Sequence, residues 1–195
     1  NSWLKLFDKK IFYFPFFSHP DPTVKRKSGF LPPVYGSSNE FGSWVNIPYF
    51  KVINEEKDIT FNPRIYADDK FILQSEYRQA FEKSNLKSDF SYNNDGNNTN
   101  THLFTKIDGD LNSNTKFNFK FQDVSNDDYL KIHNLSSSSS LIENESLLTT
   151  QLNITKNIDE NTNLDTNFTV YEDLSKKDSD RFQYILPNFT YTKNI

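Results

Sequence analysis

Apolar and polar side chains alternate along most of this chain of 195 residues. In the segment 115–122, single polar residues separate Phe117, Phe119 and Phe121 from one another. Successive side chains of a β-strand point to opposite faces of a sheet, so this spacing predicts strands with one apolar and one polar face. The same pattern occurs in four further segments: 59–66, 71–81, 148–155 and 163–171. We therefore expect an all-β fold.

The composition fits a sheet of this kind and excludes several other classes of protein. Mean hydropathy is −0.74, yet aromatic residues make up 16% of the chain, whereas disordered chains are poor in them. No apolar run approaches the ~18 residues of a membrane helix. A net charge of −4 provides no overall attraction to nucleic acid. Because this segment has no Cys, it contains no disulfide and no thiolate metal site.

The alternation predicts ten antiparallel strands, most of them close to the ~9–11 residues of a strand that crosses a membrane. They span residues 29–37, 41–52, 58–67, 70–82, 86–93, 101–111, 115–124, 147–156, 161–171 and 181–193.

The connections between these strands alternate in length. Those after the even-numbered strands are short, whereas those after the fifth, seventh and ninth strands are longer, the longest being residues 125–146. Outer-membrane β-barrels have short periplasmic turns and longer external loops. The alternation of short and long connections therefore fits a barrel whose first strand starts at the periplasmic side. The connections after the first and third strands, however, are short for external loops.

Alternation alone does not separate a membrane barrel from a β-sandwich. In a sandwich the polar face meets water and the apolar face meets a second sheet, whereas in a membrane barrel the apolar face meets lipid and the polar face lines the lumen. The environment of Phe117, Phe119 and Phe121 would distinguish the two folds. A soluble sandwich or surface adhesin that binds carbohydrate remains an alternative at this point, and so does a generic porin.

Residues 1–27 have a different pattern from the rest of the chain. In the run 11–17 the aromatic residues are not separated by polar ones, as in a strand buried on both faces or in the closing strand of a domain. A turn-rich segment, 18–22, and a basic triplet follow this run. We expect a domain boundary here, with residues 1–27 belonging to one domain and residues 28–195 to the next.

Several segments of the chain resemble a known family, the lipopolysaccharide-assembly outer-membrane proteins, also called organic solvent tolerance proteins. Residues 5–17 are similar to the end of the periplasmic β-jellyroll of this family, and residues 25–33 to the crossing into its barrel. Similarity to later barrel strands is found in Asn46-Ile-Pro-Tyr-Phe50, in 58–66, in Glu76-Tyr-Arg78 and in 181–189. The resemblance implies that 1–27 end a jellyroll and that 28–195 begin a barrel of about 26 strands.

The resemblance implies transport of lipopolysaccharide to the outer leaflet, and no catalysis. In this family the jellyroll receives lipopolysaccharide from a periplasmic bridge of similar jellyrolls, and a lipoprotein plugs the barrel lumen. The lipid part would enter the membrane at the junction of jellyroll and barrel while the sugar passes through the lumen, and the seam between the first and last strands would open. The expected partners are thus lipopolysaccharide, the plug lipoprotein, the bridge protein and outer-membrane lipid. The expected location is the outer membrane, with the N-terminal part in the periplasm.

Two prolines match those that the family uses to weaken its seam. They are Pro33 and Pro48, and Pro32 could share their role as a lateral gate. Each removes a donor from the ladder, which should weaken strand pairing by roughly 1 kcal/mol. The alternative is that prolines are simply common in these strands, since Pro63 and Pro187 also lie in strand interiors.

The junction of jellyroll and barrel offers two further groups of candidate residues. Lys25, Arg26 and Lys27 could guide lipid phosphates, or could form a solvated linker. Several phenylalanines could line a path for acyl chains, or could belong to a domain core. They are Phe12, Phe14, Phe16, Phe17 and Phe30.

The polar faces of the strands carry charged residues that would point into the lumen of a barrel. These residues could contact sugar, phosphate or the plug protein, or could only keep the lumen wet. They are Arg64, Glu76, Arg78, Lys116 and Lys120.

Enzyme activity has little support in the sequence. His19, His102 and His133 are scattered without the spacing of metal ligands. His102 with a nearby serine such as Ser91 could imitate the site of a barrel phospholipase, but proximity in sequence does not make a triad. We expect no catalytic residues, no metal site and no cofactor.

Overall fold

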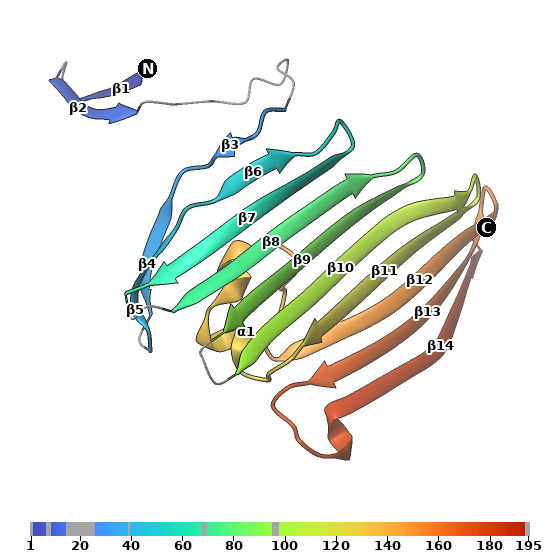
Figure 1. Ribbon diagram of the computed structural model, residues 1–195. Helices are drawn as coiled ribbons and strands as arrows, with labels where there is room; N and C mark the ends of the chain where they lie inside the picture. The colour runs from blue at the N-terminus through green and yellow to red at the C-terminus, as the bar shows by residue number, and fades with distance from the viewer. Residues whose placement is uncertain are drawn as a thin grey trace.

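The described part of the chain forms two antiparallel sheets. The computed structural model describes residues 2–6, 9–14, 26–38, 40–67, 70–94 and 98–193, and of residues 2–6 and 9–14 only the backbone. Strands β1 (Ser2–Leu6) and β2 (Lys9–Phe14) pair with each other. All other strands form one large sheet (Figure 1). The all-β prediction is confirmed. No helix in the described ranges is long and apolar enough to cross a membrane.

The large sheet is a meander in which strands pair with their neighbours along the chain. Its strands are β3 (Gly29–Phe30), β4 (Val34–Ser38), β5 (Gly42–Asn46), β6 (Tyr49–Val52), β7 (Lys57–Tyr66), β8 (Phe71–Ala80), β9 (Ser84–Asn94), β10 (Thr99–Asn112), β11 (Thr115–Val124), β12 (Leu147–Asp159), β13 (Thr162–Asp173) and β14 (Phe182–Lys193). The ten strands expected from the sequence are all present, but each of the first two is divided into two pieces.

The two divided strands are interrupted at their prolines. The first forms β3 and β4 on either side of residues 31–33, and the second forms β5 and β6 on either side of residues 47–48. β3 pairs with β6 and β4 pairs with β5, so that three residues of the first strand face two residues of the second. Such an extra residue shifts the register locally, as in a β-bulge.

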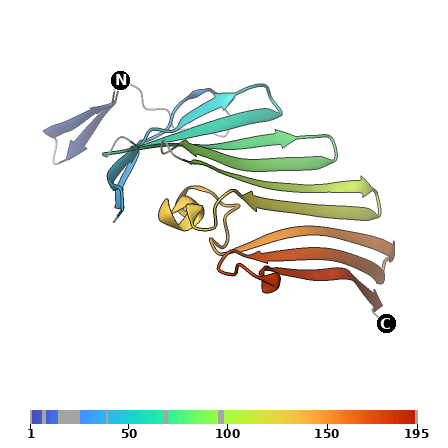
Figure 2. The ribbon, with the colours of Figure 1, turned by 60° about the horizontal axis from the view of Figure 1, so that its bottom comes forward.

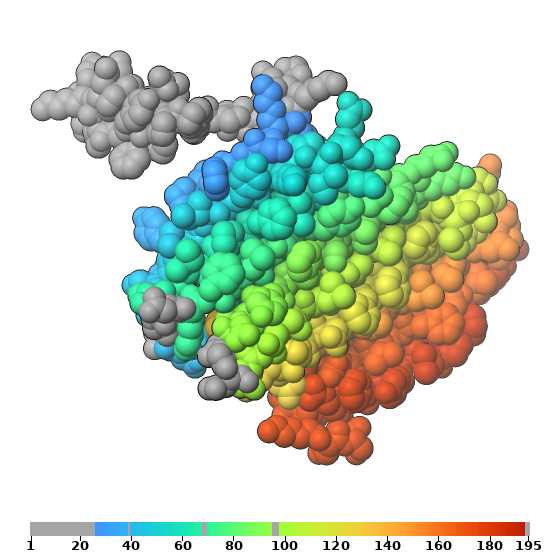
Figure 3. Space-filling model, in the orientation of Figure 1, coloured from blue at the N-terminus to red at the C-terminus, as the bar shows by residue number. Residues whose placement is uncertain are grey.

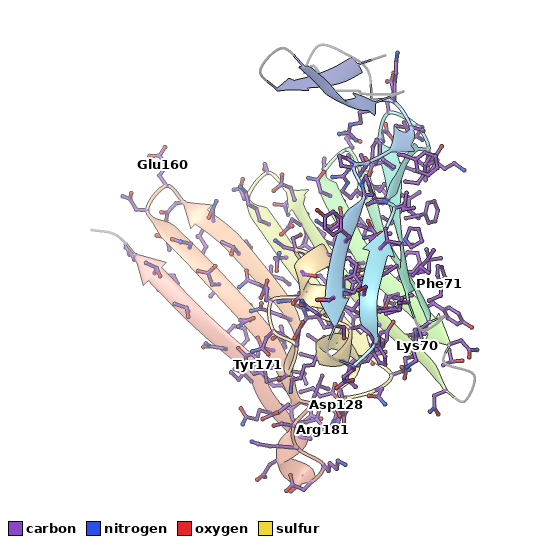
Figure 4. The ribbon with its side chains drawn as sticks, turned by 90° about the vertical axis from the view of Figure 1, so that its left-hand side faces the viewer. Lys70, Phe71, Asp128, Glu160, Tyr171 and Arg181 are labelled. Carbon is purple, nitrogen blue, oxygen red and sulfur yellow. The ribbon has the colours of Figure 1, made fainter. Side chains whose placement is uncertain are left out.

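The large sheet is curved (Figures 2 and 4). The strand register places the alternating aromatic residues on its convex face. Phe71 points away from the hollow in Figure 4. Residues that are paired across an antiparallel sheet share a face, and the register from β8 to β11 puts Phe117, Phe119 and Phe121 on the same face as Phe71. Among the described residues no second sheet covers this face, which is open in the space-filling view (Figure 3).

The connection between β11 and β12 lies against the concave face, and we call its residues 125–146 the inner loop. It contains two helical turns, α1 (Tyr129–Ile132) and η1 (Leu135–Ser138), which lie in the hollow of the sheet (Figures 2 and 4). The sequence predicts an external loop here, but the connection folds inward because five of its apolar side chains become buried. They are Tyr129, Leu130, Leu135, Leu141 and Ile142. Burying an apolar side chain of this size contributes about 1.5–3 kcal/mol.

The buried apolar core of the described residues therefore lies between the inner loop and the sheet. Besides the five residues of the inner loop, this core contains Tyr66, Ile72, Phe104, Leu148 and Leu174. Phe41, Trp44 and Val124 pack against it. The inner loop thus fastens strands together from inside the curve, from β7 on one side to β12 on the other.

Candidate functional site

A buried carboxylate holds residues 26–28, which we call the linker and which lead into the large sheet. Asp58, near the start of β7, is 1% exposed, and its two oxygens accept hydrogen bonds from Arg26 Nη1 and Arg78 Nε, both at 2.8 Å. Ser28 Oγ accepts a hydrogen bond from the amide of Val52 at 2.9 Å. Hydrogen bonds between charged groups are about twice as strong as neutral ones. The linker is therefore held against β6 and β7.

The backbone ladder is weakest where the first two strands are interrupted. The amide of Leu31 donates to the carbonyl of Pro48 at 2.9 Å, but Pro48 has no N–H with which to return the bond. On the other side of the same strand, the amide of Ile47 donates to the carbonyl of Pro63 at 3.4 Å, and Pro63 returns no bond either. Two adjacent strand pairs therefore lose a hydrogen bond at neighbouring positions.

Large apolar side chains are exposed beside this interruption. Phe30 is 76% exposed, and its ring makes a T-shaped contact with the Tyr49 ring at a centroid distance of 5.0 Å. Leu31, Val34 and Tyr35 are exposed as well. The described strand order ends at β4, so these side chains lie along a sheet edge. An exposed apolar edge is typical of a surface that meets lipid or another chain segment.

A polar cavity of about 440 Å³ lies beside the linker, between the concave face of the sheet and the inner loop. Its lining carries both signs of charge, with Arg26, Arg78, Lys87 and Lys106 against Glu55, Glu56, Asp58, Asp108 and Glu143. Ser140, Leu141 and Glu143 line it from the inner loop. Carboxylates accept and ammonium or guanidinium groups donate hydrogen bonds. This lining therefore suits a ligand with many hydroxyl groups, such as a sugar, better than an isolated anion.

A chain of buried polar side chains runs along the concave face below the inner loop. His102 Nδ1 lies 2.6 Å from Ser91 Oγ, and His102 Nε2 lies 2.5 Å from Asp89 Oδ1. Gln74 Nε2 donates to Asp89 at 3.1 Å, and Gln74 Oε1 accepts from Ser138 Oγ at 2.5 Å. The sheet supplies all of these residues except Ser138, which belongs to the inner loop.

Three of these residues have the connectivity of a serine hydrolase triad, which sequence proximity alone did not indicate. A hydrolase needs an accessible hydroxyl and free donors for an oxyanion. Ser91 is 3% exposed, its Oγ is hydrogen-bonded to Tyr129 Oη at 2.9 Å, and the backbones of Ser91 and His102 pair with each other across β9 and β10. Burial raises the pKa of Tyr129 to about 12, so its hydroxyl stays neutral. This geometry fastens the inner loop to the sheet and does not expose a nucleophile.

The far side of the inner loop is joined to the connection between β13 and β14, which contains η2 (Ser179–Arg181). Arg181 donates to both carboxylate oxygens of Asp127, at 3.0 and 2.7 Å, and to Glu172 at 2.8 Å. The hydrogen bond from Arg181 lowers the pKa of Asp127, and the two carboxylates raise the pKa of Arg181. Charge pairing therefore links two connections at the same end of the sheet.

Comparison with known proteins gives relatives that are named LPS-assembly proteins. No family model matches the chain. The chain is 32% identical over 139 residues to LPS-assembly protein LptD of Nitrosococcus oceani, a match that covers 63% of this chain and 18% of that protein. LPS-assembly protein LptD of Idiomarina loihiensis is 28% identical over 135 residues, covering 67% and 18%. LPS-assembly protein LptD of Cupriavidus pinatubonensis is 40% identical over 75 residues, covering 38% and 9%.

The chain is similar to a segment of the LPS-assembly proteins. The resemblance inferred from the sequence is thereby confirmed. In the longest of these matches the chain spans less than a fifth of the length of its LPS-assembly relatives.

The candidate residues at the junction differ in their contacts and in their exposure. Arg26 is bound to Asp58, whereas Lys27 is exposed. Phe30 is exposed beside the interruption that contains Pro32, Pro33 and Pro48. Phe12 and Phe14 lie in β2, but their side chains are outside the described set. Lys25, Phe16 and Phe17 also lie outside the described residues, as does His19.

The five charged residues expected in a lumen all occupy concave-face positions by strand register. Arg64 is buried against the inner loop, where its Nη1 donates to the carbonyl of His133. Glu76 pairs with Lys87 at 2.8 Å, and Lys120 pairs with Glu143 at 2.8 Å. Lys116 is exposed near the short turn that follows β10.

Sequence reasoning missed the buried partners of several candidates. Asp58 is the first residue of the segment 58–66, but its burial gave no signal of its own, because exposed and buried carboxylates look alike in a sequence. Asp89 was recoverable, since Asp89 and Ser91 are two residues apart and must share a face of β9. In the described part of the chain no group of three or more His, Cys, Asp or Glu side chains could hold a metal ion.

Proposed function

We propose that this chain is part of an outer-membrane β-barrel that assembles lipopolysaccharide in the outer leaflet. The observation that carries the proposal is the similarity of the chain to LPS-assembly proteins from several bacteria. The chain has no reaction of its own in this proposal, because the protein moves a lipid and does not change it. The buried position of Ser91 supports this assignment.

The large sheet supplies the first strands of the barrel, with its convex face toward lipid. The convex face supports this orientation, since it carries Phe117, Phe119 and Phe121 and has no second sheet over it among the described residues. Residues 28–195 form this first part of the barrel, and further strands close it. Residues 1–27 end a periplasmic jellyroll, for which the separate pairing of β1 with β2 is a supporting observation.

The first two strands form one side of a lateral gate, with Pro33 and Pro48 at its centre and Pro32 beside them. The backbone hydrogen bonds that Pro48 and Pro63 cannot donate support the proposal, because less free energy is needed to separate a weakly paired strand. Lipid leaves the jellyroll next to Phe30, whose exposed ring lies at the entrance to this gate. The path on the periplasmic side passes Phe12 and Phe14.

The concave face lines the lumen through which the sugar passes. The cavity beside Arg26 supports this role, since its mixed charges can bind hydroxyl groups from both sides. Lys25, Arg26 and Lys27 lie at the mouth of the lumen, and lipid phosphates bind there by exchange with the Arg26 contact to Asp58. A plug lipoprotein occupies the remaining lumen, and a bridge of jellyroll proteins delivers the lipopolysaccharide.

A soluble β-sandwich that binds carbohydrate is the competing function. It would need a second sheet against the convex face, and the described residues provide none. A generic porin would share the barrel, so only the names of the relatives favour lipopolysaccharide over small solutes.

The test uses the full-length protein in living cells with a photo-crosslinker at Phe30 and, in a second strain, at Phe119. Both residues are aromatic, but Phe30 lies beside the gate and Phe119 lies on the convex face of β11. We expect lipopolysaccharide adducts at Phe30 that require energised transport, and none at Phe119. A folded outer-membrane protein with adducts at neither site would contradict the proposal, and a soluble protein would favour the sandwich.

A further inference from the structure

A cluster of buried and partly buried side chains joins the inner loop to the hairpin of β4 and β5. The guanidinium of Arg64 lies 4.4 Å from the centroid of the Trp44 ring in β5, and Arg64 Nη1 donates to the carbonyl of His133 in the inner loop. The His133 ring stacks on Phe41, from the turn between β4 and β5, at a centroid distance of 4.9 Å. Tyr66 Oη lies 3.2 Å from His133 Nδ1. We call these five residues the joint.

The joint contains a buried cation, whose partners cannot be lost without a cost in free energy. Arg64 is 4% exposed, and Tyr66 and His133 are 3% and 7% exposed. A buried guanidinium is tolerated only when its donors are satisfied. Its partners are the His133 carbonyl, the hydroxyls of Tyr66 and Ser138 and the face of the Trp44 ring. Loss of either the loop or the hairpin side would therefore leave this charge incompletely solvated.

The hairpin has a short backbone ladder to the rest of the sheet. In the described residues, β5 pairs with β7 from Trp44 to Asn46, and the amide of Ala67 donates to the carbonyl of Ser43 at 2.8 Å. Beyond Asn46 the ladder is depleted by Pro48 and Pro63. Among the described residues, the buried Oδ1 of Asn46 has no hydrogen-bond partner. Side-chain contacts in the joint are thus a large part of what positions the hairpin.

We propose that the inner loop positions the weak first strands through the joint, with Arg64 and Phe41 as positioning residues. This inference rests on the proposed function, in which these strands form the gate. The same loop also lines the polar cavity, through Ser140, Leu141 and Glu143. The loop that holds the hairpin is therefore also one wall of the cavity.

The experiment measures amide hydrogen exchange of residues 34–46 in the full-length protein in lipid. Arg64→Met keeps the volume of the side chain and removes its charge and donors. We expect exchange of the hairpin to become about ten- to a hundredfold faster. Arg181→Met is the matched control, because it makes the same change in an arginine that holds the inner loop at Asp127, away from the hairpin. It should leave exchange of residues 34–46 within about twofold of the unmodified protein.

A second variant, Phe41→Ala, reaches the joint from the hairpin side and decides the question if Arg64→Met does not fold. It removes the stacking on His133 and should accelerate exchange of residues 34–46 about three- to tenfold. Unchanged exchange in a folded Arg64→Met or Phe41→Ala barrel would overturn the proposal. So would equal acceleration in Arg181→Met, because that result would indicate general loosening.

Surface lipopolysaccharide measured after depletion of the protein tests the proposed function separately. If surface lipopolysaccharide does not depend on the protein, the proposed function fails, whereas the exchange data still decide whether the joint positions the hairpin. If it does depend on the protein and the joint exists, folded Arg64→Met should alter surface lipopolysaccharide while Arg181→Met does not.

Discussion

The first two strands and the strands from β7 onward are built from similar alternating sequences but are paired very differently. β12 and β13 pair from Leu147 to Asp159 with one register shift near the turn. The first strand, by contrast, contacts the second in two short pieces, β3 with β6 and β4 with β5. Strand length and alternation therefore do not determine how strongly a strand is held.

Proline alone does not explain the difference. Pro187 lies inside β14, where the register with β13 also shifts by one residue. That shift is isolated within a long pairing. Near the N-terminal edge, Pro33, Pro48 and Pro63 lie at neighbouring positions on three successive strands. The clustered loss of backbone donors weakens strand pairing at this place in the sheet. The inner loop packs on the strands from β7 onward and contacts the β4–β5 hairpin through the joint.

The largest effect is expected from a substitution that weakens the packing of the inner loop on the well-paired strands. Leu130→Ala should destabilise the docking of the inner loop by about 2–5 kcal/mol, since Leu130 is fully buried and a cavity would remain. Protease cleavage within residues 125–146 of the folded protein measures the loss. Leu103→Ala is the control, because Leu103 is 43% exposed on the convex face. Equal cleavage of both variants would show that the inner loop does not depend on its apolar packing.

The next effect concerns the attachment of the weak region to β7. Asp58→Asn should weaken both arginine contacts, and each charge-assisted hydrogen bond contributes about 1.5–3 kcal/mol at most, less here because the arginines are partly exposed. Trypsin cleavage after Arg26 should become about tenfold faster. Asp110→Asn, at an exposed carboxylate of β10, should have no such effect. Resistance to trypsin in Asp58→Asn would contradict the role of Asp58 in holding the linker.

A smaller effect is expected from a substitution that strengthens the pairing of the first two strands. Pro48→Ala restores an amide that can return the hydrogen bond to Leu31, which contributes about 1 kcal/mol. Exchange at residues 29–34 should slow about fivefold, and surface lipopolysaccharide should decrease because the gate separates less readily. Pro187→Ala supplies an amide far from the gate and should leave surface lipopolysaccharide unchanged. Equal effects of the two substitutions would remove the distinction between clustered and isolated prolines.

The smallest effect is a pH dependence in the well-paired region. The pKa of Asp127 is lowered by its hydrogen bond from Arg181, so this contact is complete above the ordinary carboxylate pKa of 3.8 and is lost as pH falls through the lowered value. Both groups are near the surface, so the contribution is at most about 1 kcal/mol. Protection of residues 174–181 should decrease below about pH 4. Asp127→Asn should reduce this change, and a remainder is expected from Asp173, whose pKa is lowered by hydrogen bonds from Ser175. A transition near neutral pH would contradict the assignment to Asp127.

The sequence predicted the ten strands well because one apolar face gives each strand a clear period of two. It also pointed to Pro33 and Pro48, but not to the division of their strands, since the register shift depends on which residues face each other. The inward fold of residues 125–146 was not predicted, because Tyr129, Leu130 and Leu135 have no strand periodicity.

The joint was beyond sequence reasoning for a different reason. Arg64 and His133 are 69 residues apart and meet only because a loop returns across four strands. Arg64 was correctly assigned to a polar face by its alternation, but the pattern does not distinguish a residue that faces open solvent from one covered by a loop.

The most direct test of the comparison measures amide exchange along the first strands of the unmodified full-length protein in lipid. In a closed barrel every strand has two neighbours, so the edge of this chain would no longer explain fast exchange by itself. Our account predicts that residues 29–36 and 44–50 exchange at least about tenfold faster than residues 115–124. Equal protection of these segments would contradict the claim that the first two strands are built as the weak place of the sheet.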